Sequence, residues 1–194
     1  MENDIEKKLT DAEAIEKNKA LLREYPFLKP YGADTWEDDP YDYSWTMLDL
    51  VCLGWQKMFL EYCSKIKEEL TKANVPLDQF YFCDIKEKWG SLRVSVGGPC
   101  PDEVDKLVEA METDSLLYCP SCGKPSKVVT SGYILYICED CAKEAKLNHR
   151  PLTAEDIPYY TYYKTDENGN ETKERREVPH RELFLAQWTG GKEG

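Results

Sequence analysis

Two pairs of cysteines in the C-terminal half of the chain have the spacing of metal ligands. Cys119 and Cys122 form one C-x-x-C pair, Cys138 and Cys141 form another, and fifteen residues separate the pairs. Paired C-x-x-C motifs at this spacing are typical of structural zinc sites, in which four ligands surround one ion tetrahedrally. The sequence therefore predicts that these cysteines bind one structural Zn²⁺ ion. Redox dithiols and disulfides are the alternatives, and an expected reducing environment disfavours disulfides.

The residues around each pair predict how the four sulfurs converge. Gly123 follows the first pair and can take the positive φ that closes a tight knuckle. Residues 126–137 read as two short strands around Gly132, which return the chain to the knuckle. Cys138 then opens a short helix, so that Cys141 lies one turn later on the same face. Knuckle, hairpin and helix in this order are the treble-clef arrangement.

Four cysteine ligands argue against a catalytic metal. A catalytic zinc keeps one coordination position for water, and four cysteines fill every position. His149 and His180 are the only histidines, which excludes a His-rich hydrolytic centre, and both are interpreted as structural or surface residues. Two enzymatic alternatives remain open: a reactive thiol at Cys100, before a predicted helix, and a pair of carboxylates. The candidate carboxylates are Asp84, Glu87 and Asp102.

Apolar periodicity predicts three helices outside the cysteine module. Steps of three and four predict a helix over 45–73, in which Cys52 and Cys63 are interpreted as core-filling residues. A weaker pattern predicts a helix over 4–24, with residue 11 as an alternative start. Acidic residues in the first turn support a helix over 100–115. These helices are expected to pack on a sheet formed by the segments between them.

Two hairpins complete the predicted fold. Alternating residues predict strands over 80–96 with a turn near 87–91, and Asn168 with Gly169 marks the turn of a second, Tyr-rich hairpin. The predicted class is α+β: a helix–β-hairpin–helix body with a treble-clef or zinc-ribbon-like four-cysteine module and a C-terminal β-hairpin. The predicted segments are 1–43 (helix and acidic, aromatic connector), 44–117 (α+β body), 118–150 (zinc module) and 151–194 (C-terminal hairpin and tail).

The composition is that of a folded protein with a strong excess of acid. The chain has 194 residues, 41% of them hydrophobic and 32% charged, and its formal charge is −12. No apolar run approaches the roughly 20 residues that span a membrane, and the N-terminal segment does not read as a secretory signal, so a cytoplasmic protein is expected. The negative charge disfavours binding to nucleic acids and to membrane surfaces, because both attract basic proteins.

Five stretches, in the same order along the chain, carry a resemblance to a known family: LLREYPFLKP, YDYSWTMLD, GWQKMF, IKEKWGSLRVSV and CPSCGKP…TSGYILYICEDCA. Over residues 20–142 the chain resembles a family of small, uncharacterised zinc-cluster proteins of phages and prophages. The resemblance implies an intracellular, phage-associated protein whose four paired cysteines bind metal, and it implies no activity. A phage setting favours a host-takeover or anti-defence role by association alone.

The function that these features favour is non-catalytic binding to a protein partner. Aromatic clusters dominate interface energies, which makes the aromatic residues of 31–45 and 159–163 candidate anchors. One candidate partner is a basic, nucleic-acid-binding host protein, which an acidic chain would attract. The candidate interaction residues are Trp89, Arg93, Tyr160 and Tyr162.

Two other classes of function stay open. The first is a nucleic-acid-binding regulatory protein that uses the zinc module, because the part of the chain around this module is nearly neutral. The second is a small enzyme with a carboxylate or Cys100 site. The first alternative requires that the basic residues of this region share one face. Those residues are Lys124, Lys127, Lys143, Lys146, Arg150 and the run 173–176.

Overall fold

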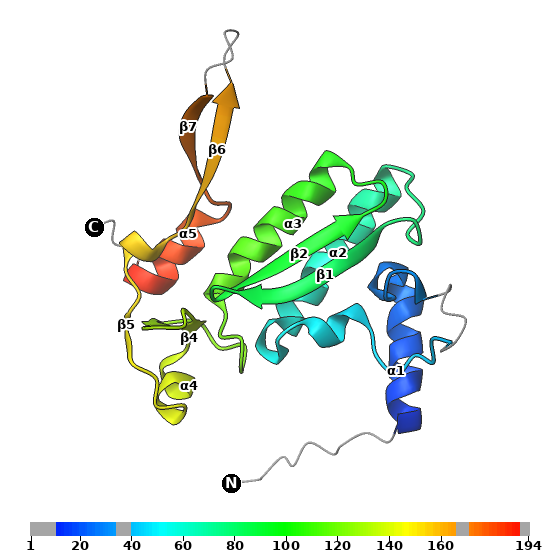
Figure 1. Ribbon diagram of the computed structural model, residues 1–194, viewed down its shortest axis with the longest axis horizontal. Coiled ribbons are helices and arrows are strands. Elements are labelled where there is room, and N and C mark those ends of the chain that lie inside the picture. Colours follow the sequence, from blue (N-terminus) through cyan, green and yellow to red (C-terminus); the bar gives the residue numbers. More distant parts are fainter. Residues whose placement is uncertain (1–10, 34–39, 166–170, 191–194) are drawn as a thin grey trace.

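The computed structural model describes residues 11–33, 40–165 and 171–190. Over these residues the chain is a mixed helix-and-sheet fold, compatible with the predicted α+β class. Figure 1 shows a two-stranded hairpin with two long helices against it, a small sheet with a short helix beside it, and a second hairpin that projects next to α5. Among the described helices, none has the length and apolar character needed to cross a membrane.

The first helix, α1, spans Asp11–Glu24, which agrees with the later of the two predicted starts; residues 4–10 lie outside the described residues. Pro26 then begins a short 3₁₀ turn, Pro26–Leu28, because proline suits the first turn of a helix but cannot continue one. Phe27 and Leu28 in this turn are fully buried and fix α1 to the body. The turn at the C-terminal end of α1, rather than a long apolar face of the helix, therefore attaches α1 to the body.

The prediction of one helix over 45–73 is wrong in its first third. Two 3₁₀ turns, Met47–Leu50 and Leu53–Trp55, precede α2, which spans Gln56–Lys72. The carboxylate of Asp49 accepts a hydrogen bond from the Thr46 backbone N–H at 2.6 Å, and the Thr46 hydroxyl accepts one from Leu48 N–H. This capping box closes the first turn and separates it from α2.

The first hairpin confirms the predicted strands. β1 spans Tyr81–Lys88 and β2 spans Ser91–Gly97, and the turn between them has positive φ at Trp89 and Gly90 (56° and 78°), as a two-residue type I′ turn requires. The pairing shifts between Phe82 and Asp84. This β-bulge lets Phe82 and Ile85, three positions apart, both point into the core.

Two helices cover the hairpin. α3 spans Asp102–Asp114 after Pro101, as predicted, and packs beside α2 and against β2. The body core between these elements contains Trp55, Phe59 and Cys63, each fully buried. The interpretation of Cys63 as a core residue is confirmed, whereas Cys52 is only partly buried. Burial also raises the pKa of the Cys63 thiol well above its ordinary value, so the group stays neutral.

The C-terminal segment contains the predicted hairpin and more. β6 (Tyr159–Thr165) pairs antiparallel with β7 (Glu171–Glu177). A short helix, α5 (Arg181–Phe184), and a π-helical turn (Leu185–Thr189) follow the hairpin, where the sequence predicted no element. Side chains of these two elements belong to a second buried apolar cluster. Its members include Leu116, Leu117, Val129, Leu152, Phe184 and Trp188.

A carboxylate links the body to this C-terminal segment. Asp114, at the end of α3, is only 7% exposed, and its Oδ2 accepts a hydrogen bond of 2.6 Å from the Tyr62 hydroxyl. The Nδ1 atom of His180 lies 2.9 Å from the same oxygen. A buried carboxylate must be hydrogen-bonded to offset its lost hydration, so both partners stabilise the junction.

We expect Tyr62→Phe to lower the free energy of unfolding by about 2 kcal/mol, because the lost bond ends on a buried carboxylate. Tyr25→Phe is the matched control: its hydroxyl lies 2.7 Å from that of Ser64, and loss of a bond between neutral groups costs about 1 kcal/mol. Urea unfolding of both variants measures the two costs. Equal losses would show that the carboxylate contributes nothing beyond an ordinary hydroxyl contact.

Candidate metal centre

The four paired cysteines come together in one cluster. Their sulfur atoms all lie within 4.8 Å of one another, and the Sγ atoms of Cys122 and Cys138 are 3.6 Å apart. Four thiolates around one ion at a Zn–S distance of about 2.3 Å would lie about 3.8 Å apart. A disulfide needs about 2.05 Å, and all eight cysteines are free, so the disulfide alternative is wrong. Elsewhere in the described residues, no other group of three or more histidine, cysteine or acidic side chains has this geometry.

The first pair lies in a tight knuckle. The N–H of Cys119 donates to the carbonyl of Lys124 at 2.8 Å, and the N–H of Gly123 donates back to the carbonyl of Cys119 at 2.9 Å. Gly123 has φ +74°, the left-handed conformation that the sequence predicts for this position. Tyr118 and Pro125 form a bridge across the base of the knuckle. The backbone thus fixes both sulfurs of this pair on the same side of the turn.

The second pair follows a small sheet. β3 (Val128–Thr130) pairs with β4 (Tyr136–Ile137), which confirms the two predicted strands, and α4 (Glu139–Glu144) begins directly after Cys138. The N–H of Cys141 points at the sulfur of Cys138 at 3.5 Å. A third strand, β5, runs along the other edge of β3 and spans His149–Pro151. β5 was not predicted, because its residues carry no alternating pattern.

The cluster has a buried side and an open side. Cys119 and Cys138 are buried, Cys141 is partly buried and Cys122 is exposed. The apolar residues Val128, Ile137 and Ala142 back the buried sulfurs. An ion held here is therefore shielded by protein on one side and reachable from solvent past Cys122.

The surroundings of the sulfurs decide which ones ionise. Burial raises the pKa of the Cys119 thiol, but the backbone N–H groups of Cys138, Cys122 and Ser121 outweigh burial and bring that pKa below its ordinary value. Burial and the neighbouring sulfurs raise the pKa values of Cys122 and Cys141. One thiolate thus disfavours ionisation of the others, and a bound cation is the group that lets all four ionise together.

The knuckle docks on the body at Gly54. The N–H of Gly54 donates to the carbonyl of Pro120 at 2.9 Å, and the indole N–H of the buried Trp55 donates to the carbonyl of Tyr118 at 2.8 Å. A Cβ at position 54 would lie 2.0 Å from the Cys119 carbonyl oxygen and 2.5 Å from the Gly123 nitrogen. Only glycine allows this approach. The sequence signal was present, since a glycine inside an otherwise helical pattern often marks close backbone contact.

Comparison of the whole chain with protein-family models, curated protein sequences and solved structures finds no match. The resemblance to phage zinc-cluster proteins therefore stays a prediction.

The enzymatic candidates are not brought together by the fold. His149 is exposed, with Nδ1 2.7 Å from the Leu147 carbonyl, and His180 faces Asp114. Burial and the nearby carboxylates of Asp105 and Asp102 raise the pKa of the Cys100 thiol, the opposite of what a reactive thiolate needs. The other two candidate carboxylates have ordinary structural partners. Asp84 pairs with Lys86, and Glu87 accepts hydrogen bonds from Gly90 N–H and the Tyr133 hydroxyl.

The four predicted interaction residues differ in their surroundings. Trp89 is 61% exposed at the tip of the first hairpin. The guanidinium group of Arg93 forms an ion pair, since its Nη1 lies 3.4 Å from Glu112 Oε2. The side chains of Tyr160 and Tyr162 lie outside the described residues. Trp89 is therefore the candidate whose apolar surface the structure leaves open.

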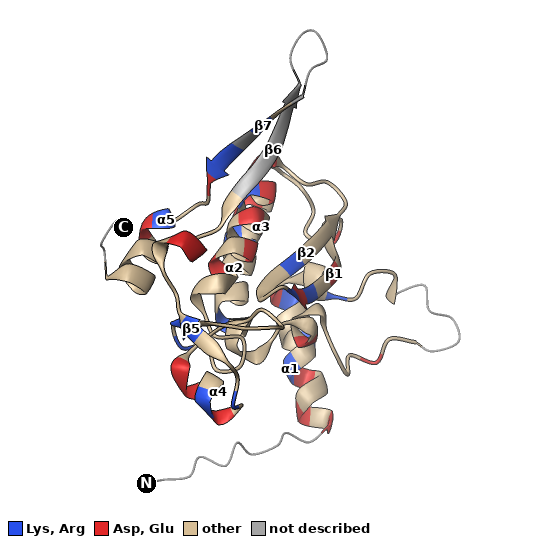
Figure 2. Cartoon of the chain, turned by 60° about the vertical axis from the view of Figure 1, so that its left-hand side comes forward, with Lys and Arg blue, Asp and Glu red and all other residues tan. Residues whose placement is uncertain are grey.

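The basic residues near the cysteines are mostly matched by acids. Lys124 pairs with Asp140, Lys143 pairs with Glu139, Arg150 holds Asp156 through two hydrogen bonds, and Arg176 pairs with Glu109. Figure 2 shows that acidic residues (red) predominate along α3 and α4, with few basic residues (blue) between them. Because each of these bases is matched by an acid, the four pairs together supply no net positive charge to attract a phosphate backbone. The arrangement thus weakens the nucleic-acid alternative.

Proposed function

We propose that Cys119, Cys122, Cys138 and Cys141 bind one Zn²⁺ ion in a closed, structural site of the treble-clef or zinc-ribbon type. Four soft sulfur donors at near-tetrahedral spacing support zinc, and a filled shell leaves no position for a reacting water. The order of knuckle, small hairpin and short helix supports the fold type. The ion is thus a part of the scaffold.

The identity of the metal is testable without any functional assay. Protein purified without added metal is expected to contain about one zinc ion per chain by elemental analysis, because four thiolates with no oxygen or imidazole ligand favour zinc over magnesium or calcium. Iron in equal amount, with the visible absorption of an iron–sulfur centre, would contradict the assignment.

We further propose that the protein is non-catalytic and acts by binding a protein partner. The observation that carries this proposal is a set of three exposed apolar residues, Trp89, Tyr133 and Ile134, called the patch below. They lie on the tip of the first hairpin and on the loop between β3 and β4, two segments whose backbones touch. Trp89 and Tyr133 are 61% and 60% exposed, and Ile134 is 37% exposed. Large aromatic side chains open to water at one place are typical of interfaces.

The metal module holds one half of this patch in place. A Cβ on Gly90, next to Trp89, would lie 3.0 Å from the Ile134 carbonyl oxygen and 3.2 Å from the Leu135 Cα, so the hairpin tip and the loop between β3 and β4 are in contact. The Tyr133 hydroxyl donates to the Glu87 carboxylate across the same contact. Loss of the ion would therefore separate the two halves of the patch.

The charge of the chain favours a basic partner. A formal charge of −12 attracts basic surfaces at long range and speeds their association, while the apolar patch supplies short-range contact. A host nucleic-acid-binding protein has this chemistry, and it fits the host-takeover or anti-defence role that the phage resemblance favours. This partner class is a proposal that rests on charge and on the patch together.

The test is a capture experiment with a variant that leaves the backbone unstrained. We expect immobilised wild-type protein to retain a basic partner from host lysate and the Trp89→Asn variant to lose at least about 90% of it, as loss of a central aromatic anchor often costs about 2 kcal/mol or more. Asparagine suits position 89 because it tolerates positive φ. Quantitative mass spectrometry measures the retained fraction.

Leu183→Ala is the matched control, since Leu183 is an exposed apolar residue on α5, outside the patch and outside the predicted anchor segments. It is expected to retain the partner. Equal retention by wild type and Trp89→Asn would refute the patch as the interface, and a retained partner that is acidic would refute the charge argument.

A further inference from the structure

The open side of the cysteine cluster borders a cavity. Its volume is about 280 Å³, and it lies between the knuckle and the first turns of α2. Lys57 and Glu61 line it on the α2 side, and Cys122 and Gly123 line it on the knuckle side. A water molecule takes up about 30 Å³, so several molecules of that size fit into this space. Small polar solutes can therefore reach Cys122, the exposed thiol of the four.

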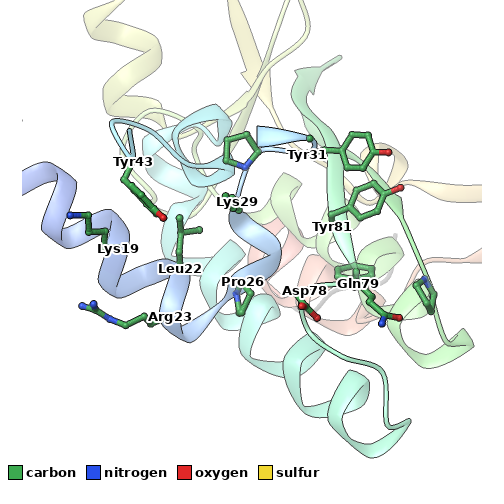
Figure 3. A pocket seen from close by; sticks show the side chains of 14 residues that line it. Lys19, Leu22, Arg23, Pro26, Lys29, Tyr31, Tyr43, Asp78, Gln79 and Tyr81 are labelled. Carbon is green, nitrogen blue, oxygen red and sulfur yellow. The ribbon is translucent and has the colours of Figure 1, made fainter. Parts of the chain in front are cut away.

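A larger cavity, of about 930 Å³ between α1 and β1, has no thiol in its described lining. Figure 3 shows the basic residues Lys19 and Arg23 at one end of it and the ring of Tyr31 at the other, with these side chains directed away from each other. The charged and aromatic groups of that cavity thus do not meet on one small ligand. The smaller cavity differs because a thiol lies in its wall.

A second sulfur lies beside that of Cys122. The Sγ atom of Cys138 is 3.6 Å away, while all four sulfurs of the cluster lie within 4.8 Å of one another. Cys138 is 5% exposed and packs with Val128 and Ile137, so a solute that enters the cavity meets Cys122 first. Cysteines that respond to oxidants combine an accessible thiolate with a second thiol close enough to react with its oxidised form. Cys122 and Cys138 have these two positions.

We propose that hydrogen peroxide oxidises Cys122 and Cys138 to a disulfide, and that this reaction releases the metal ion. The proposal rests on the metal centre proposed above and does not depend on the protein partner. A cysteine that ligates a metal is deprotonated, and the thiolate is the form that attacks peroxide. Disulfides that form in reducing compartments are usually transient and respond to redox conditions. The cluster is thus a modification site as well as a structural one.

Two successive displacements account for all atoms and electrons. The Cys122 thiolate attacks one oxygen of peroxide, the O–O bond breaks and hydroxide leaves, so the sulfur becomes a sulfenic acid and gives two electrons to the oxidant. The Cys138 thiolate then attacks the Cys122 sulfur, the S–S bond forms, the S–O bond breaks and a second hydroxide leaves. Each hydroxide takes up one proton. One peroxide thus yields one disulfide and two water molecules.

The disulfide removes two of the four ligands. Cys119 and Cys141 remain, and two thiolates do not complete the tetrahedral shell that a structural zinc ion needs. The two sulfurs must approach by about 1.5 Å to reach the disulfide distance. Because Cys138 caps the start of α4, the disulfide keeps the knuckle linked to this helix after the ion has left. A thiol reductant can therefore restore the site.

The test treats the zinc-containing protein with excess hydrogen peroxide and measures released zinc with a chromogenic chelator. We expect release of about one zinc ion per chain, and mass spectrometry of the alkylated, non-reduced protein should locate the first disulfide between Cys122 and Cys138. A thiol reductant with added zinc should restore the metal content. Protein that keeps its zinc in excess peroxide overturns the proposal. Release with a first disulfide between other cysteines, or with no disulfide, also overturns it.

Two variants identify the sulfur that reacts first. Cys122→His replaces the exposed ligand by imidazole, and three cysteines with one histidine are also a structural zinc set. We expect it to release zinc at least about tenfold more slowly than wild type, because no accessible thiolate remains at position 122. Cys83→Ser removes an exposed thiol on β1 and is the matched control, expected to release zinc at the wild-type rate.

Equal rates in Cys122→His and wild type would overturn the role of Cys122. The position of the first disulfide in the wild type decides the same point without any variant. Wild-type protein that contains no zinc before peroxide is added refutes the metal centre itself, which distinguishes that failure from failure of the oxidation step.

Discussion

Replacing Cys122 by serine is expected to remove the bound metal and to unfold the segment from Tyr118 to Leu152. Apparent binding free energies of structural zinc are about 10–16 kcal/mol, and the metal-bound segment has only a small apolar cluster of its own. A serine hydroxyl is a poor zinc ligand, so the remaining three sulfurs hold the ion weakly. Metal content should fall from about one ion per chain to near zero. Amide hydrogen exchange should show loss of protection in β3, β4 and α4.

Cys83→Ser is the control for this experiment. Cys83 is exposed at the bulge of β1, so its replacement removes a thiol without touching the cluster. This variant is expected to keep its metal and its melting temperature. Full metal content and an unchanged melting curve in Cys122→Ser would show that the four sulfurs do not act as one site.

Gly54→Ala is expected to lower the free energy of unfolding by at least about 3 kcal/mol while leaving the cysteines able to bind metal. The added Cβ would meet three backbone atoms of the knuckle at 2.0–2.9 Å, and backbone cannot rotate away as a side chain can. Either the knuckle or the turn that carries Gly54 must shift, which breaks the hydrogen bond from Trp55 to Tyr118. Chemical unfolding measures the loss of stability, and metal analysis shows whether the four cysteines still bind the ion. Together they distinguish detachment of the knuckle from the body from loss of the metal.

Gly132→Ala is the matched control for position 54. Nothing lies within 4 Å of a Cβ at position 132, but φ there is +86°, so alanine is strained without being crowded. Its expected cost is about 1 kcal/mol. If alanine at position 54 costs no more than alanine at position 132, the close contact between turn and knuckle is not what joins the module to the body.

The parts of the fold that the sequence predicts are those with local signals. The knuckle depends on two cysteines three positions apart and on Gly123, and the first hairpin depends on Gly90 with alternation on both sides. Each of these features needs only neighbours along the chain. Their geometry is therefore close to the prediction, and the four sulfurs lie together as the spacing requires.

The segment 45–55 shows why periodicity can mislead. Leu48, Cys52 and Trp55 have the spacing of a helix, but only Trp55 is buried, and Met47 and Val51 enter the core in place of the other two. The segment forms two 3₁₀ turns instead, and the bend between them puts Gly54 against the knuckle. A contact between residues far apart in the chain sets this shape, and no local pattern encodes it.

The C-terminal helix escaped prediction for the same reason. α5 and the turn after it are short and follow a charged strand, and Phe184 and Trp188 are held by contacts with Leu117 and Val129 rather than by helix propensity. Contacts of this kind become visible only when the chain is folded.

The hydrogen bond from the Trp55 indole to the Tyr118 carbonyl has a consequence for dissecting the molecule. A fragment that stops before Tyr118 removes the acceptor of the Trp55 indole N–H, and a donor left buried without an acceptor costs about 1–3 kcal/mol. Phenylalanine at position 55 would remove that donor and make such a fragment easier to produce. A fragment that begins at Tyr118 lacks the turn at Gly54 against which its knuckle packs. Neither half is therefore suited to transfer into another scaffold on its own.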